Sequence, residues 1–154
     1  MLELRRTTSA HPDFQLLVAE LDHALRVLDG ADHAFYAQFN KLTNINHVVV
    51  AYDDAEPVGC GAFKEFEAGT VEIKRMYVRP ARRGQGVARA VLAELEQWAR
   101  AAGYHTAVLE TGKRQPEAIG LYETSGYAHT PNYGQYIGDA NSVCLRKPLV
   151  GEGA

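Results

Sequence analysis

Cysteine, tryptophan and long apolar runs are all scarce in this chain. It has 154 residues, of which two are cysteine and one is tryptophan. Cys60 and Cys144 lie in apolar, strand-like surroundings without the spacing of metal ligands, which predicts buried, reduced thiols. No apolar run approaches the roughly 20 residues that cross a bilayer, and the N-terminal MLELRRTT lacks the apolar core of a signal peptide. We therefore expect a cytoplasmic protein with no membrane partner.

An excess of basic charge is also missing. The formal net charge is −3, whereas nucleic-acid-binding proteins usually carry a strong basic excess, so we expect no nucleic-acid partner. The histidines show no mutual spacing typical of metal ligands, and we expect no metal. The positive charge that is present gathers locally and suits a small polyanion. It consists of Arg79, Arg82, Arg83, Arg89, Lys113 and Arg114.

Apolar periodicity predicts about four helices. Apolar residues recur at helical spacing over 13–28, and 31–41 is a short second helix or an ordered loop. The clearest helix covers about 84–101, where residues such as Val87, Val91 and Leu95 form one stripe, and Gly103 ends it. A further helix follows Pro116 and extends to about residue 124.

The rest of the pattern predicts strands. Their order among the helices indicates one domain over 1–150, followed by a frayed tail at 151–154. The fold class is mixed α/β, with about six to seven strands in a mostly antiparallel sheet and one strand-helix-strand crossover. The predicted strands cover 2–7, 47–53, 58–66, 70–78, 104–110, 127–130 and 142–147.

The passage from the strand at 70–78 into the helix at 84–101 is the most informative stretch. The strand stops at Pro80, and a basic turn containing Gly84 and Gly86 opens into the helix. Free backbone N–H groups at the positive end of a helix dipole bind phosphate, and glycine leaves no Cβ to hold a ligand away. The pattern therefore predicts a phosphorylated cofactor.

Two stretches carry a family resemblance. The first is Arg83-Gly84-Gln85-Gly86-Val87-Ala88, and the second runs from Gln115 to Tyr127, QPEAIGLYETSGY. They are similar to two patterns of the GCN5-related N-acetyltransferase (GNAT) superfamily: the cofactor loop Gln/Arg-x-x-Gly-x-Gly/Ala, and the later Asn-x-x-Ala-x-x-Leu-Tyr-x-x-x-Gly-Phe. Gln115 stands for the usual Asn and Tyr127 for the usual Phe.

The resemblance implies an acetyl-coenzyme A site. In this superfamily the pyrophosphate rests on backbone N–H groups of the glycine loop, and the pantetheine arm adds like a strand to the fourth strand. Gln115 and Tyr122, in the second pattern, are expected near the same cofactor. The expected cofactor-binding residues are therefore Met76, Val78, Arg83, Gly84, Gln85, Gly86, Val87, Ala88, Gln115 and Tyr122.

Three residues are expected to act in catalysis. Tyr122 stands where the resemblance implies a phenol that protonates the coenzyme A thiolate as it leaves, although a tyrosine on a helix can also simply pack on the sheet. Glu72 and Glu110 are alternative bases that would take a proton from an acceptor ammonium. In the alternative interpretation Glu72 pairs with a basic neighbour across the sheet and Glu110 caps a strand end. His47 is a third candidate base.

Aromatic residues mark the expected acceptor pocket. They lie in the two regions where the superfamily builds it, and tyrosine combines an apolar ring with a polar hydroxyl that suits a small amine. Core packing or a dimer surface is the alternative. The candidates are Phe35, Tyr36, Phe39, Tyr133 and Tyr136.

Three functions are compared. The favoured one is an N-acetyltransferase that transfers acetyl from acetyl-CoA to a primary amine, expected to be a small molecule, by direct attack in a ternary complex. The alternative is a non-catalytic acyl-CoA-binding or sensing module. A dinucleotide-binding domain fits poorly, because the loop lacks the full G-x-G-x-x-G spacing. A homodimer is expected by analogy alone.

Overall fold

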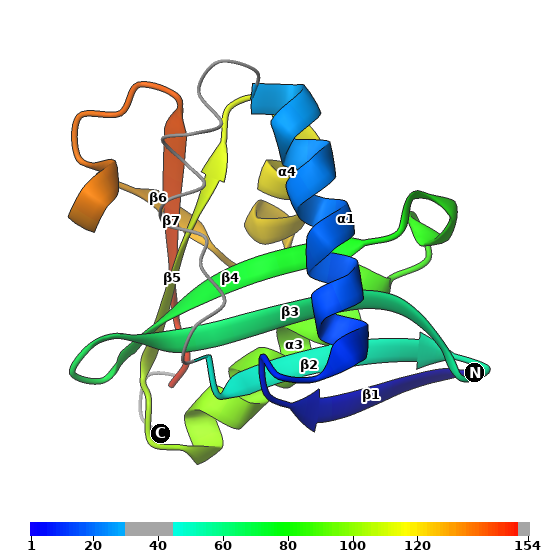
Figure 1. Cartoon of the computed structure of the whole chain (residues 1–154). Helices are drawn as coiled ribbons and strands as arrows, with labels where there is room; N and C mark the ends of the chain where they lie inside the picture. Colours follow the sequence, from blue (N-terminus) through cyan, green and yellow to red (C-terminus); the bar gives the residue numbers. More distant parts are fainter. Residues whose placement is uncertain (30–44, 151–154) are drawn as a thin grey trace. The chain divides into compact units, whose positions relative to one another are not determined.

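The computed structural model describes residues 1–29 and 45–150, which form a mixed α/β fold (Figure 1). The three α-helices described are α1 (Pro12–Asp29), α3 (Val87–Ala101) and α4 (Pro116–Thr124). Single-turn 3-10 helices cover Pro80–Arg82 and Gly134–Tyr136. The seven strands are β1 (Leu2–Thr7), β2 (His47–Asp53), β3 (Glu56–Glu67), β4 (Thr70–Val78), β5 (Thr106–Gly112), β6 (Ala128–Thr130) and β7 (Ser142–Pro148).

The predicted order of elements is confirmed, with differences at the ends. The predicted seven strands are present, but the described residues contain three α-helices rather than about four. The segment 31–41 and the tail at 151–154 lie outside the described residues. Helix α3 begins at Val87 rather than near Gly84, because Gly84 and Gly86 both adopt positive φ angles, which a right-handed helix does not allow.

The strands pair in the order β1-β2-β3-β4-β5-β7-β6. By the density of its internal contacts the chain divides into two compact units. The first comprises Met1–Lys64 and Lys74–Leu95, and the second Glu65–Ile73 and Glu96–Ala154. The single domain expected over 1–150 stays a prediction.

The first unit is built on antiparallel strands. Strand β1 pairs with β2 from Leu2 opposite Asp53 to Thr7 opposite Val48. Strand β2 turns back into β3 through Asp54 and Ala55, whose φ angles are 50° and 69°. Two consecutive left-handed residues make a turn whose twist matches that of the flanking strands, so this connection is a tight hairpin.

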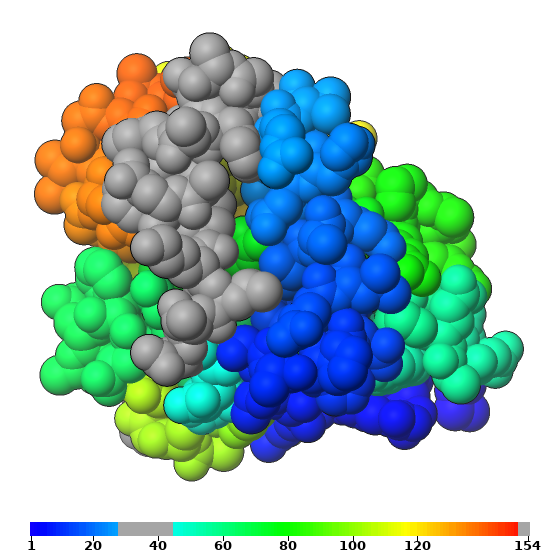
Figure 2. All heavy atoms as spheres, in the orientation of Figure 1, coloured from blue at the N-terminus to red at the C-terminus, as the bar shows by residue number. Residues whose placement is uncertain are grey.

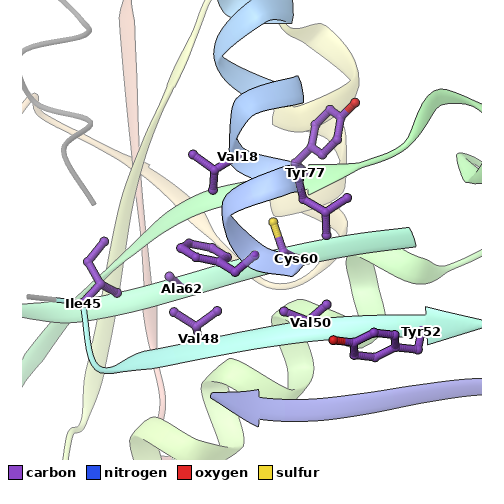
Figure 3. Packing of buried hydrophobic residues seen from close by; sticks show 10 residues of the cluster. Val18, Ile45, Val48, Val50, Tyr52, Cys60, Ala62 and Tyr77 are labelled. Carbon is purple, nitrogen blue, oxygen red and sulfur yellow. The ribbon is translucent and has the colours of Figure 1, made fainter. Parts of the chain in front are cut away.

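Helix α1 covers one face of these strands (Figure 1). Phe14, Leu17 and Val18 recur at helical spacing and are buried. Figure 3 shows Val48 and Val50 of β2 pointing toward the helix. In the space-filling view the outer side of α1 forms the surface of this face (Figure 2). The strand residues buried in this core are Val48, Val50, Tyr52, Cys60, Ala62 and Tyr77.

Helix α3 packs closely against two glycines of β3. A Cβ on Gly61 would lie 2.9 Å from Val91 Cγ1 and from Leu95 Cδ1, and a Cβ on Gly59 would lie 2.9 Å from Val87 Cγ1. Any side chain at these positions would push the helix away. The predicted apolar stripe of the helix is thus confirmed as its buried face. This packing fixes the N-terminal turn of α3, and with it the glycine loop that precedes the helix.

The second unit contains the parallel pair of the sheet. Strand β4 pairs with β5 from Thr70 opposite Thr106 to Ile73 opposite Leu109, and α3 lies between the two strands in the sequence. This is the predicted strand-helix-strand crossover. Strand β7 then pairs antiparallel with β5 and with β6. The mostly antiparallel character predicted for the sheet is confirmed.

Candidate functional site

The glycine loop presents an open backbone in the first unit. Gly84 has a φ of 78° and Gly86 a φ of 84°, a region that residues with a Cβ rarely adopt. A Cβ built on either glycine meets no atom within 4 Å. Helix α3 starts at Val87, and its first N–H groups have no partner within the helix. The arrangement suits an anion such as a pyrophosphate, as the sequence predicted.

Acidic side chains already pair with two of the arginines before this loop. Arg79 donates from Nε and Nη2 to the two carboxylate oxygens of Glu20, at 3.1 and 2.9 Å, and Arg79 lowers the pKa of Glu20. Arg82 donates to Asp53 at 2.5 Å and to Glu56 at 3.2 Å. These guanidinium groups therefore brace the turn against α1 and the β2–β3 hairpin, and the backbone of the loop remains as the anion-binding element.

Among the described residues, Arg83 contacts strand β4 instead of an acidic side chain. Its Nε donates to the carbonyl oxygen of Val78 at 2.9 Å, and its guanidinium lies 5.8 Å from the ring centre of Tyr77. Val78 and Met76 direct their side chains toward the α3 side, where they lie against Gly59 and Gly61. A ligand pairing with this part of β4 would therefore meet backbone, and would share the Val78 carbonyl with Arg83.

Arg75 interrupts β4, a feature that the sequence reasoning missed. Its φ is 59°, so the strand predicted for 70–78 is not regular over its whole length. Its side chain is only 2% exposed, and Nη2 donates to Oδ1 of Asp22 at 2.6 Å. The Sγ of Cys60 donates to the Arg75 carbonyl at 3.5 Å. No sequence signal distinguishes this arginine from an ordinary strand residue.

An acidic–tyrosine cluster forms in the second unit. We define it as Glu72, Glu110, Tyr133, Tyr136 and Ser142. The Tyr133 hydroxyl donates to Oε2 of Glu72 at 2.8 Å, and the Ser142 hydroxyl donates to Oε2 of Glu110 at 2.7 Å. The rings of Tyr133 and Tyr136 meet edge to face at 5.6 Å. The structure thus brings together four residues that the sequence predicted for the site and adds Ser142, which it did not.

Burial and the nearby carboxylates keep the phenols of Tyr133 and Tyr136 protonated. Burial raises the pKa of Tyr133 and so does the carboxylate of Glu72. Burial also raises the pKa of Tyr136, followed by the charges of Glu72 and Glu110. Both carboxylates therefore lie close enough to Tyr136 to oppose a further negative charge. Two carboxylates beside hydroxyl donors have the chemistry that an ammonium ligand requires.

Tyr122 is buried on α4 in the same unit. Burial raises its pKa well above the ordinary value, and the charge of Glu110 adds to the effect. Within residues 1–29 and 45–150 its hydroxyl has no hydrogen-bond partner. Its ring meets that of Tyr127 edge to face at 5.8 Å. A neutral, desolvated phenol next to a carboxylate can protonate a leaving thiolate.

The remaining predicted residues lie outside the acidic–tyrosine cluster. Gln115 precedes α4 as its N-cap without a side-chain capping bond. Gln85 is exposed, Ala88 is half-buried and Val87 is buried. His47 stacks on Phe63 at 4.5 Å, and burial lowers its pKa. Three predicted pocket residues, Phe35, Tyr36 and Phe39, lie outside the described residues.

Both thiols are buried and free, as predicted. Burial raises the pKa of Cys60 to about 12 and also raises that of Cys144. Across the described residues, no three His, Cys, Asp or Glu side chains are placed to share a metal ion. None of the three described helices is long and apolar enough to cross a membrane.

Comparison with known proteins gives consistent matches. The model of the acetyltransferase (GNAT) family matches residues 13–127. The IAA acetyltransferase of Azospirillum brasilense is 37% identical over 135 residues, which cover 86% of this chain and 88% of that protein. A Klebsiella pneumoniae protein assigned to the acyl-CoA N-acyltransferases is 32% identical, with a TM-score of 0.82 over 97% of this chain and 99% of its own.

A more distant structure shares the fold alone. It is a GNAT family acetyltransferase from Elizabethkingia anophelis with acetyl-CoA bound, which is 19% identical, with a TM-score of 0.70 over 96% of this chain and 97% of its own. The open glycine loop, the buried tyrosine of α4 and these matches lead to one conclusion. The chain belongs to the acetyltransferase (GNAT) family and is an acyltransferase.

Proposed function

We propose that this protein transfers an acetyl group from acetyl-CoA to the primary amine of a small molecule, by direct attack within a ternary complex. The observation that carries the proposal is the loop at 83–88, where two left-handed glycines open the backbone at the start of α3. The acidic–tyrosine cluster supports an amine as the acceptor, because a protonated amine is attracted to two carboxylates.

The cofactor would be held mainly by backbone groups. In the loop from Arg83 to Ala88 the N–H of Arg83 donates to the Pro80 carbonyl at 3.3 Å, and the N–H groups from Gly84 onward would bind the pyrophosphate at the positive end of the α3 dipole. The backbone of Met76 and Val78 would pair with the pantetheine arm. Gln115 would add a polar contact at the start of α4.

The reaction would need two protons removed from the acceptor ammonium and one supplied to the leaving sulfur. A carboxylate takes a proton from the acceptor ammonium, directly or through a water, and the freed nitrogen attacks the thioester carbonyl. The C–S bond then breaks, and Tyr122 donates its proton to the departing sulfur. The second proton of the nitrogen passes through water to the Tyr122 phenolate, which leaves a neutral amide and a neutral phenol. Glu110 suits the role of base better than Glu72, because Glu110 is half-buried and its charge raises the pKa of Tyr122. Glu72 is buried and already accepts a hydrogen bond from Tyr133.

Direct attack is favoured over an acyl-enzyme. A covalent route would need a reactive thiolate, and both cysteines are buried with raised pKa values. Initial rates measured at several concentrations of both substrates would then give intersecting lines, whereas parallel lines would indicate a covalent intermediate.

A non-catalytic acyl-CoA-binding module is the second candidate. It would use the same loop but would have no need of a desolvated Tyr122 near Glu110. Homodimer formation and a cytoplasmic location stay predictions.

The first test is isothermal titration of the protein with acetyl-CoA, with Gly86→Trp as the control that blocks the loop. Saturable binding that the variant loses supports the cofactor site. A panel of amines, to which IAA is added because a relative carries it in its name, is then scored by release of coenzyme A thiol. Binding without thiol release for any acceptor would favour the non-catalytic module, and folded protein that does not bind would overturn the proposal.

A further inference from the structure

The end of helix α4 ties Tyr122 to Tyr127 through the backbone. The N–H of Tyr127 donates to the carbonyl of Tyr122 at 3.0 Å, and the N–H of Gly126 donates to that of Glu123 at 3.2 Å. Gly126 has a φ of 97°. These bonds form a Schellman motif, in which the residue after the glycine commonly packs against the residue that accepts its hydrogen bond. The edge-to-face contact of the two tyrosine rings is that packing.

Tyr127 is anchored at its other end. Its hydroxyl donates to Oε2 of Glu96 at 2.8 Å, and Nζ of Lys147 donates to Oε1 of the same carboxylate at 2.8 Å. The Glu96 side chain is only 6% exposed, so a buried charge is satisfied by one donor on each oxygen. The Lys147 ammonium also lies 5.7 Å from the centre of the Tyr127 ring.

The hydrogen bond from Tyr127 to Glu96 depends on a departure from the family pattern, namely tyrosine in place of the usual phenylalanine. The superfamily pattern places phenylalanine at position 127, which has no hydroxyl to offer. Here the added hydroxyl meets a carboxylate from α3, and a lysine from β7 balances that carboxylate. Side chains from α3 and β7 therefore converge on the Tyr127 ring, and that ring contacts Tyr122 of α4, the residue proposed to protonate the leaving thiolate.

We infer that Glu96, Tyr127 and Lys147 are positioning residues that hold the Tyr122 ring in place for proton donation. The inference rests on the proposed function. The Tyr122 ring packs edge to face on the Tyr127 ring at 5.8 Å, and the N–H of Tyr127 donates to the Tyr122 carbonyl, so the direction of the Tyr122 hydroxyl follows the position of Tyr127. Tyr127 supplies that packing, and Glu96 prevents Tyr127 from turning away.

The test is a double-mutant cycle on the full chain, scored as kcat and KM with acetyl-CoA and an active amine. Tyr127→Phe keeps the ring and removes the anchor, and we expect kcat to fall about tenfold with KM for acetyl-CoA unchanged. In a Tyr122→Phe background the same change should have no further effect on kcat, because the group being positioned is already absent.

Tyr104→Phe is the matched control. Tyr104 also donates its hydroxyl to a glutamate, Glu65 at 3.2 Å, in the same unit, and this variant should keep the wild-type kcat. A thermal melt of each variant confirms folding, and Glu96→Gln, which keeps an acceptor for Tyr127, should retain more activity than Tyr127→Phe.

The experiment distinguishes a failure of the proposed role of Tyr122 from a failure of the positioning inference. If Tyr122→Phe alone leaves kcat unchanged, the proposed role of Tyr122 is wrong and the positioning inference is wrong with it. If Tyr122→Phe lowers kcat but Tyr127→Phe does not, or if the two losses multiply in the double variant, only the positioning inference is overturned.

Discussion

The hydroxyl of Tyr133 donates a 2.8 Å hydrogen bond to the carboxylate of Glu72, although the two residues are 61 positions apart in the sequence. Glu72 is only 3% exposed. A buried carboxylate needs donors, and Tyr133 supplies one from the loop that precedes β7. The contact therefore links the conformation of that loop to a charge within the sheet.

Tyr133→Phe removes this donor and keeps the ring contacts with Phe66 and Tyr136. We expect the free energy of unfolding to fall by about 1–3 kcal/mol, because a charged acceptor loses a hydrogen bond in a buried place. Urea denaturation measures this loss. The KM for the amine should rise at the same time, since the loop is less firmly held. Unchanged stability would show that the bond contributes nothing in solution.

Gly86→Ala tests whether the positive φ at this position is needed for acetyl-CoA binding, apart from its effect on stability. The alanine meets no neighbour, but a φ of 84° costs a residue with a Cβ about 1–2 kcal/mol, so the loop should relax and bind acetyl-CoA more weakly. Gly103→Ala is the matched control at the other end of α3, with a φ of 96° and equally open space. It should lose similar stability and keep its affinity in titration calorimetry. Equal losses of affinity in both variants would contradict a binding role for the loop.

The raised pKa of Tyr122 predicts the alkaline side of the pH profile. In the proposed mechanism the phenol acts as an acid and must be protonated, and burial and Glu110 raise its pKa above the ordinary tyrosine value of about 10. We therefore expect kcat to show no loss from this group up to about pH 10. Tyr122→Phe should lower kcat by about 100-fold at every pH in that range. A kcat that falls with an apparent pKa well below 10, in the wild type but not in the variant, would contradict this assignment.

Asp22 balances the buried guanidinium of Arg75. Asp22→Ala should lower the free energy of unfolding by about 3 kcal/mol, because it leaves a buried charge without its partner. Glu3→Ala is the control, since Glu3 pairs with Arg5 where both side chains are more than half exposed, and that pair is worth less than about 1 kcal/mol. Similar losses in the two variants would show that Arg75 finds another partner or water.

Local features of the protein could be predicted from the sequence. The glycines at 84 and 86, Pro80 and the apolar stripe of α3 act over a few residues, and the loop they predict is present. The same holds for the start of α4 at Pro116 and its end before Gly126. The start of α3 was placed too early, because the spacing of apolar residues does not reveal which glycines adopt a positive φ.

The sequence by itself determined which backbone conformations are accessible and which faces are apolar, since these depend on neighbouring residues. The tertiary structure alone decided which distant side chains meet. Glu72 meets Tyr133, Glu96 receives both Tyr127 and Lys147, and Arg75 pairs with Asp22. Such pairings follow from strand register and from the need of each buried charge for a partner, and both are settled only when elements far apart in the chain pack together.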